Sequence, residues 1–213
     1  MAATLFRPPA VALLEIYSLG AALVVLDRIE KSAGVSLLQA ELNDAYGLFL
    51  KLTGDSDSVR IAVDCAREVT GEMKVALTAE VLDAPDAGTW SVIQSAPEYQ
   101  PLLEQSVVFI PQTRNPSMTE KPKSPEALGL LETQGFAAVT AATDAACKAA
   151  NVRVIAKEKL GGGYITVIFE GDVAAVTAAV EAGRSAAEGV GKLISAYVIP
   201  RPSEGVGQIL TRL

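Results

Sequence analysis

Hydrophobic and polar positions follow one pattern twice along this chain. The pattern of residues 10–85 returns at residues 127–202, with every position shifted by 117. Apolar, charged and glycine positions all keep this register, as in the pairs Leu13 and Leu130, Asp27 and Asp144, Lys31 and Lys148, and Gly54 and Gly171. A gapless register over about 75 positions indicates an internal repeat. The chain therefore contains two tandem copies of one small unit.

Each copy is predicted to fold into four strands and two helices, because short apolar runs alternate with longer helical patterns. The predicted strands are 10–17, 35–41, 47–52 and 75–82 in the first copy, and 127–133, 152–159, 164–169 and 192–199 in the second. The predicted helices are 19–31 and 59–70, and 136–149 and 173–187. The fold class is α/β (α+β): two tandem domains, each a four-stranded antiparallel or mixed sheet with helices packed on it.

Helix ends are predicted from single residues. Gly34 and Asn151 follow the first helix of each copy, where a left-handed residue often ends a helix. Asp55 and Asp172 each precede the second helix, where an aspartate side chain can cap the free amide groups.

The segment between the copies does not keep the register. Its start is expected to be irregular, and it carries weaker patterns for a helical turn (98–105, matched to the end of the second copy), a short strand (107–110) and a proline-rich linker (111–125). We divide the chain into a first domain (1–86), a connecting segment (87–124) and a second domain (125–213), with a short last helix expected over 204–213.

Composition narrows the possible functions. Half of the residues are hydrophobic but only 5% are aromatic, and the mean hydropathy is positive. Small domains have a large surface, so this apolar excess favours burial against other subunits. The net charge of −7 argues against a nucleic-acid partner. No apolar run reaches the roughly 18 residues of a membrane span, so a soluble protein without a membrane partner is expected.

The residue types that usually carry catalysis are scarce. The chain has no histidine, the commonest general base and metal ligand. Cys65 and Cys147 have no metal-binding spacing and are expected to be small buried apolar residues. Glu15 and Glu132 occupy matching positions but have no proton-transfer partner, so a structural role is simpler. We expect no enzyme activity, no metal and no cofactor.

The most conspicuous local motif is a run of three glycines, Gly161, Gly162 and Gly163, between two predicted strands. A phosphate-binding loop would lead into a helix, so a nucleotide site is disfavoured and a hairpin turn is the simple interpretation. The matching turn of the first copy consists of Asn43, Asp44, Ala45 and Tyr46. An aspartate in a turn often caps its own backbone.

The second copy resembles a known family over nearly all of residues 126–213. The segments ALGLLET, DAACKAANV, EKLGGGYITVIFEGDVAAV and VIPRPS resemble the shell-protein domain of bacterial microcompartments. The first copy shares this resemblance mainly through the repeat register. Two copies in one chain are similar to the tandem-domain class, whose trimers imitate the hexamers of single-domain relatives. The resemblance implies a structural shell tile in the cytoplasm, which forms a homotrimer and assembles with other shell proteins.

The same resemblance implies two kinds of site. Glycine-rich turns line the central pore in this family, so the pore for small metabolites would be lined by Asn43, Asp44, Ala45, Tyr46, Gly161, Gly162 and Gly163. Three Asp44 carboxylates around one axis would favour cations over small anions. Neither turn contains a cysteine, so an iron–sulfur cluster at the pore is not expected.

Tile edges are the second kind of implied site, at Lys31, Lys148 and Arg201, although the counterpart of Arg201 in the first copy is Ala84. A plain account of the two lysines is a favourable charge near a helix C-terminus, and the two roles are compatible.

Two other functions compete with the shell tile. A ligand-binding regulatory protein built on ferredoxin-like repeats would have an enclosed pocket and would not assemble into sheets. An enzyme of unrecognised type is disfavoured by the absence of histidine and of any catalytic motif.

Overall fold

Two four-stranded sheets form the framework of the protein. The computed structural model describes residues 9–43, 47–93 and 125–210. The first half contains β1 (Ala10–Ile16), α1 (Leu19–Ser32), β2 (Ser36–Asn43), β3 (Gly47–Gly54), α2 (Ser56–Met73), β4 (Leu77–Leu82) and α3 (Ala87–Ile93). The second half contains β5 (Ala127–Gln134), α4 (Phe136–Ala149), β6 (Arg153–Gly161), β7 (Tyr164–Gly171), α5 (Val173–Val190), β8 (Lys192–Pro200) and α6 (Glu204–Leu210).

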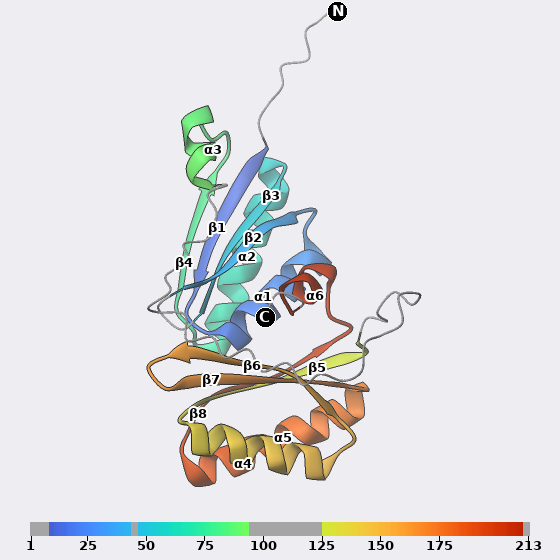
Figure 1. The fold of residues 1–213 in the computed structure, drawn as a ribbon. Helices are drawn as coiled ribbons and strands as arrows, with labels where there is room; N and C mark the ends of the chain where they lie inside the picture. The colour runs from blue at the N-terminus through green and yellow to red at the C-terminus, as the bar shows by residue number, and fades with distance from the viewer. Residues whose placement is uncertain (1–8, 44–46, 94–124, 211–213) are drawn as a thin grey trace, which may run out of the picture.

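The two sheets have the same topology. Their strand orders are β2-β3-β1-β4 and β6-β7-β5-β8, and all their pairings are antiparallel. The predicted fold class is therefore confirmed, and the sheets are antiparallel rather than mixed. Both halves place their strands and helices in the same order, as the repeat in the sequence requires (Figure 1).

The second sheet is buried on both faces, which explains its nearly continuous apolar sequence. Leu131 and Phe169 face α4 and α5 in one apolar core. Leu128 and Leu130 point the other way and join the core of the first half. The helices α4 and α5 approach closely at Gly183 of α5, where a Cβ atom would lie only 2.9 Å from the Ala142 carbonyl oxygen of α4.

Helix starts follow the prediction, but two helix ends do not. Asp55 accepts a hydrogen bond from the Ser58 amide at 2.9 Å, and Asp172 accepts one from the Ala175 amide at 2.8 Å, so both N-caps are confirmed. Gly34 and Asn151 do not take the predicted left-handed conformation. Each first helix ends in extended backbone one residue earlier, at Ala33 and Ala150, because a strand follows almost at once.

The connecting segment begins with a helix, which the sequence did not predict. Residues 84–93 were expected to be irregular, yet α3 forms there. Adding 117 to the bounds of α3 gives the bounds of α6 without a shift. The repeat therefore extends to residue 93, and α3 is the counterpart of the predicted last helix. The weaker patterns at 98–105 and 107–110 lie outside the described residues.

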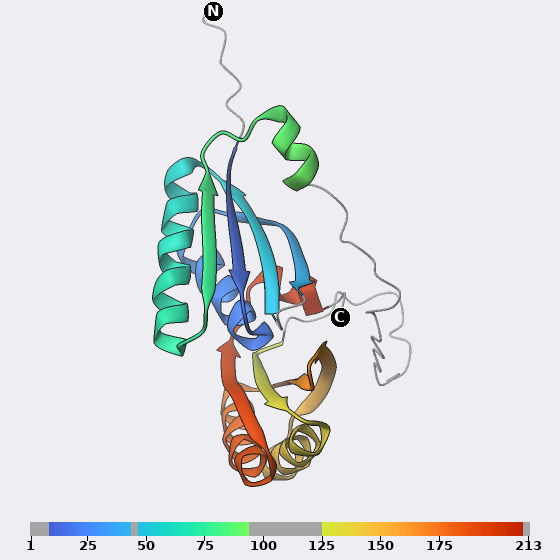
Figure 2. The ribbon, with the colours of Figure 1, turned by 90° about the vertical axis from the view of Figure 1, so that its left-hand side faces the viewer.

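The two halves share one core instead of folding side by side. Helix α1 contacts β8 and β5 of the second half, and α6 packs on α1 and β2 of the first half. Figures 1 and 2 both show α1 and α6 between the two sheets. The predicted domain boundaries at residues 86 and 124 stay predictions. Helix α6 follows the second sheet in sequence but packs against α1 and β2 of the first half.

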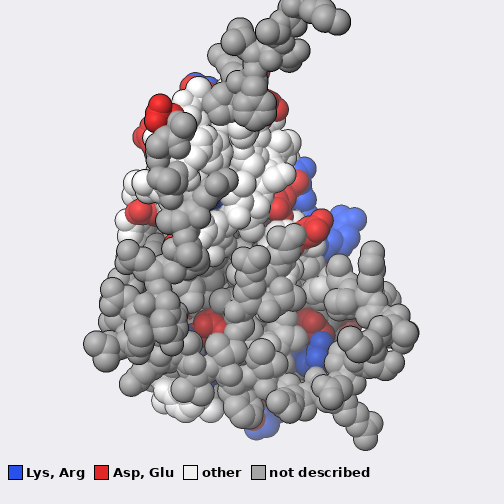
Figure 3. Space-filling model, turned by 45° about the horizontal axis from the view of Figure 1, so that its top comes forward, with Lys and Arg blue, Asp and Glu red and all other residues white. Residues whose placement is uncertain are grey.

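Charges are mixed on the visible surface. In Figure 3, acidic and basic side chains lie between uncharged ones over the described residues, without a broad basic area. Within the described part of the chain, no helix has the length and apolar character to cross a membrane.

Candidate functional site

The glycine turn closes the β6–β7 hairpin at its end. Gly161 pairs with Tyr164, which leaves Gly162 and Gly163 as a two-residue turn. The φ angles of Gly161, Gly162 and Gly163 are +86°, +54° and +82°, a region that costs other residues about 1–2 kcal/mol. All three glycines are exposed. Backbone conformation therefore accounts for the glycines, as expected for a tight hairpin.

Two carbonyl groups of this turn are held back against β5. Gly163 O accepts a hydrogen bond from the Gly135 amide at 2.7 Å, and Gly162 O accepts one from Gln134 Nε2 at 3.3 Å. In a trans peptide the N–H points opposite to the C=O. The Gly163 N–H, which shares a peptide with Gly162 O, therefore points away from β5.

The matching turn of the first half is only partly described. Asn43 ends β2 and Gly47 begins β3, and the two residues pair across the hairpin. Asp44, Ala45 and Tyr46 lie outside the described residues. The described ends of the β2–β3 hairpin, at Asn43 and Gly47, therefore correspond to the end of the β6–β7 hairpin that carries the glycine turn.

Glu132 joins the two halves at the start of α1. Its Oε2 accepts hydrogen bonds from Ser18 Oγ at 2.7 Å and from Ser195 Oγ at 3.1 Å. Ser18 is the N-cap of α1, so a carboxylate of the second half lies at the N-terminus of a helix of the first half. Burial raises the pKa of Glu132, while the hydroxyls of Ser18 and Ser195 oppose that shift. Glu132 therefore connects β5 and β8 of the second half to the start of α1.

A row of buried polar side chains extends from Glu132 across the sheet. Glu132 pairs with Thr166 on β7, and Thr166 pairs with Glu158 on β6. Burial raises the pKa of Glu158 to about 7, and Lys157 lowers it in part. The counterpart of Glu158 in the first half, Glu41, forms an ion pair with Lys51, whose Nζ lies 2.8 Å from Glu41 Oε1. The geometry of this pair does not meet that of a hydrogen bond. The second sheet has Ile168 at the position of that lysine, so Glu158 lacks the equivalent ion pair.

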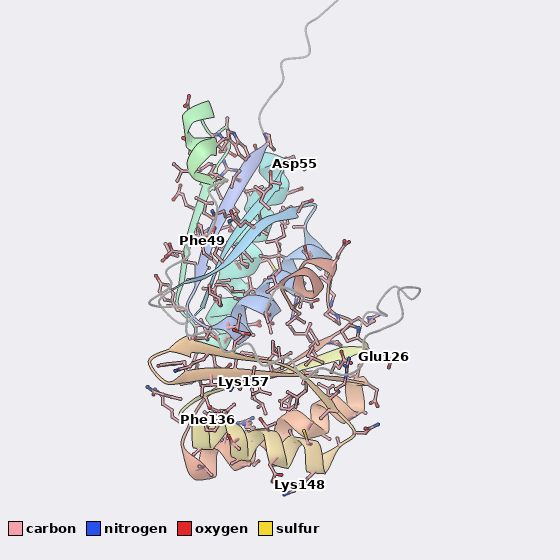
Figure 4. The ribbon with its side chains drawn as sticks, viewed as in Figure 1. Phe49, Asp55, Glu126, Phe136, Lys148 and Lys157 are labelled. Atoms are coloured by element: carbon pink, nitrogen blue, oxygen red, sulfur yellow. The ribbon has the colours of Figure 1, made fainter. Side chains whose placement is uncertain are left out.

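The three predicted edge residues do not share one environment. Lys31 Nζ bonds Asp27 at 2.7 Å and Pro200 O at 3.0 Å, so it lies at the junction beside Arg201. Among the described residues, Lys148 bonds only its own helix neighbour, Asp144, at 2.6 Å. Figure 4 shows Lys148 at the outer helices of the second half, away from that junction. The exposed side-chain fractions, 42% for Lys31 and 74% for Lys148, reflect this difference.

A groove of about 340 Å³ lies beside α4, on the side that α6 covers in the first half. Its lining includes Phe136 and Cys147 of α4, and Val154 of β6. Phe136 is 62% exposed, and the Lys157 ammonium lies 5.3 Å from its ring centre. Figure 4 labels both residues in the second half. The expectation that both cysteines are buried is wrong for Cys147, which is exposed, while Cys65 is partly buried. Cys147 is exposed because no helix or strand of the described residues covers that side of α4.

Both halves of the chain match the same known protein family. The BMC domain matches residues 10–85 and again residues 127–202. The chain belongs to the BMC-domain family. It carries two BMC domains in tandem, each with the four-stranded antiparallel sheet and packed helices described above.

Relatives of the BMC domains include proteins of one and of several domain lengths. Bacterial microcompartment shell protein PduA of Citrobacter freundii is 49% identical over 87 residues, which cover 41% of this chain and 94% of PduA. Bacterial microcompartment shell protein EutM of Escherichia coli is 49% identical over 77 residues, covering 36% of this chain and 79% of EutM. Carboxysome assembly protein CcmO of Synechococcus elongatus is 32% identical over 176 residues, covering 83% of this chain but only 59% of CcmO.

A crystal structure of a microcompartment protein from Desulfitobacterium hafniense aligns with 94% of this chain and 98% of its own, at 24% identity and a TM-score of 0.39. A score that low carries no argument about how the halves are arranged. The family and its relatives together support a structural role in a bacterial microcompartment shell.

Proposed function

We propose that the chain is a structural tile of a bacterial microcompartment shell, a homotrimer in which six BMC domains surround a central pore for small metabolites. The observation that carries the proposal is the tandem pair of BMC domains with equivalent hairpin turns. Three chains would supply six such turns, as six single-domain subunits would. The tile would assemble with further shell proteins in the cytoplasm and would have no catalytic role.

The pore would be lined by turns of two kinds in alternation. One kind is the glycine turn of Gly161, Gly162 and Gly163, and the other is the turn of Asn43, Asp44, Ala45 and Tyr46. The turned-back carbonyls of Gly162 and Gly163 support the presence of an outward N–H donor at Gly163. Three Asp44 carboxylates would add a negative ring, screened over about 8 Å at physiological salt.

Two measurements test the proposal. Light scattering should give a mass of about 67 kDa, three times the 22.2 kDa of the chain. A stable monomer or dimer at micromolar concentration would refute the trimer.

Flux through reconstituted shells then tests the pore with two variants. Asp44→Lys should raise the ratio of anion to cation flux, because it replaces three negative charges with three positive ones. Gly162→Asn should lower the flux of every solute, since asparagine tolerates a positive φ better than most residues and adds bulk. If Asp44→Lys leaves the ratio unchanged while Gly162→Asn lowers both fluxes, the pore exists without an electrostatic filter. If neither variant changes flux, the turns do not line the pore.

A further inference from the structure

The glycine turn at the end of the β6–β7 hairpin has the geometry of one of two related turns (Figure 1). Its two central residues, Gly162 and Gly163, have φ angles of +54° and +82°, so the turn is of type I′. A type II′ turn closes the same two-residue hairpin and needs a positive φ only at its first central residue. With glycine at both positions, side-chain strain does not decide which turn forms.

The two turns differ in the direction of one peptide plane, the one between Gly162 and Gly163. Rotating that plane converts type I′ into type II′ and reverses Gly162 O together with the Gly163 N–H. The pairing of Gly161 with Tyr164 is kept, because both turns close a two-residue hairpin. In the observed turn, Gly162 O faces β5 and the Gly163 N–H points away from it. In a type II′ turn, the carbonyl oxygen would point outward instead.

One side chain of the neighbouring strand contacts this peptide plane. Gln134, the last residue of β5, donates a hydrogen bond from Nε2 to Gly162 O at 3.3 Å. The bond from the Gly135 amide to Gly163 O, at 2.7 Å, involves the next peptide plane, which has the same direction in both turns. Only the bond from Gln134 depends on the rotation. Gln134 therefore stabilises the type I′ turn over the type II′ turn.

We propose that Gln134 determines the specificity of the pore by holding the glycine turn in type I′. This inference rests on the pore proposed above. In type I′ the turn offers the Gly163 N–H to a passing solute, and in type II′ it would offer Gly162 O. N–H donors attract anions and solutes with carbonyl oxygens, whereas carbonyl oxygens attract cations and solutes with hydroxyl or amine donors. The side chain of Gln134 thus selects the class of solute without lying in its path.

The first half of the chain gives an internal contrast. The counterpart of Gln134 is Tyr17. Its hydroxyl donates to Glu15 Oε2 at 3.3 Å, so this side chain bonds a residue of its own segment. The turn that matches the glycine turn, residues 43–46, contains no glycine in its sequence. A choice between two glycine turns therefore belongs to the second half alone.

Two substitutions should shift the turn by independent routes. Gln134→Met nearly keeps the length of the side chain and removes the donor. Gly163→Ala keeps Gln134 but disfavours the positive φ that type I′ requires at position 163. Space is available for the added methyl group, since a Cβ atom there would lie 3.7 Å from Gln134 Cγ.

Flux through reconstituted shells measures the effect with two small ions, acetate and methylammonium. Each substitution should lower the ratio of acetate to methylammonium flux by about twofold or more, because the loss of one hydrogen bond shifts a two-state equilibrium by about two- to tenfold. The double variant should lower the ratio by less than the product of the two single effects, because both substitutions act on one equilibrium.

Gly162→Ala is the matched control. It adds the same methyl group one residue earlier, where both turns have a positive φ, so it favours neither turn. It should lower the flux of both ions and leave their ratio unchanged. Crystal structures give a readout that does not depend on flux: Gly162 O should point away from β5 in Gly163→Ala and toward β5 in the parent.

The outcomes separate this inference from the pore itself. If Gly162→Ala lowers both fluxes while Gln134→Met leaves the ratio unchanged, the pore stands and Gln134 does not set its specificity. An unreversed peptide in Gly163→Ala, or single effects that multiply fully in the double variant, would also overturn the role of the turn. If none of the three single variants changes any flux, the glycine turn does not line a pore, and the proposed function fails together with the inference.

Discussion

Replacing Glu132 tests whether the junction between the halves depends on a buried acceptor or on a buried charge. Its Oε2 takes two hydroxyl hydrogen bonds, and hydrogen bonds to a charged group contribute about 1.5–3 kcal/mol each. Removal of the carboxylate also relieves its desolvation, which is the main cause of its raised pKa. We expect Glu132→Ala to lower the free energy of unfolding by about 2–4 kcal/mol.

The isosteric variant Glu132→Gln should behave differently. The amide oxygen can still accept from Ser18 and Ser195, and the amide nitrogen can donate toward Thr166, whose Oγ1 is buried without a partner. A raised pKa means that the surroundings disfavour the charge, so its loss should change stability by less than about 1 kcal/mol at pH 7.

The pH dependence gives an independent check. A carboxyl group with a folded-state pKa above its unfolded value near 4.3 binds more protons when folded, between the two values. Its contribution to stability is full below about pH 4 and is lost as the pH rises through the folded pKa. Relative to Glu132→Gln, the parent should therefore lose stability as the pH rises from the unfolded value through the raised pKa of folded Glu132.

Urea unfolding at one fixed protein concentration measures both effects, since oligomer stability depends on concentration. If Glu132→Gln destabilises as strongly as Glu132→Ala at pH 7, or if the parent gains stability relative to it as the pH rises, the charge itself holds the helix N-terminus and the reasoning is wrong.

Two further predictions concern other charged residues. Lys148→Ala should impair the assembly of trimers into sheets, seen by electron microscopy, without lowering the melting temperature of the trimer. Lys31→Ala should also lower the free energy of unfolding by up to about 1 kcal/mol, because it loses the hydrogen bond to Pro200 O. Undiminished sheets from Lys148→Ala would refute the edge role. Glu158→Gln should stabilise the protein relative to the parent by about 1–2 kcal/mol above pH 7, because burial raises the pKa of the parent carboxyl to about 7. This gain should disappear as the pH is lowered from about 7 to 4.5, where the parent carboxyl takes up its proton. A gain from Glu158→Gln that does not change across this window in urea titrations would contradict the raised pKa.

Much of the fold is readable from the sequence because it depends on local periodicity. The strand predicted over 10–17 and the N-caps at Asp55 and Asp172 depend on neighbours only a few residues away, and these predictions are confirmed. Helix α3 was missed because its sequence, AGTWSVI, has little helical periodicity of its own. Extending the 117-residue register past residue 85 would have found it.

Some features of the candidate site were also predicted correctly from the sequence, and others were not. The glycine turn was found because positive φ angles demand glycine. Cys147 was predicted to be buried because helical patterns do not show which helix face stays uncovered. The different partners of Lys31 and Lys148 could not be predicted from the sequence, because the two lysines occupy matching positions in the repeat.

The sequence by itself determined two copies of one α/β unit and their strand and helix order, since local periodicity and a constant register carry that information. The resemblance of segments such as EKLGGGYITVIFEGDVAAV pointed to the family. Only the tertiary structure decided which copy of each repeated residue is buried. Glu132, Lys31 and Leu19 lie at the junction while Glu15, Lys148 and Phe136 do not. The physical reason is that the two halves of one chain meet at one junction, where each half presents a different surface, so matching residues have unlike surroundings.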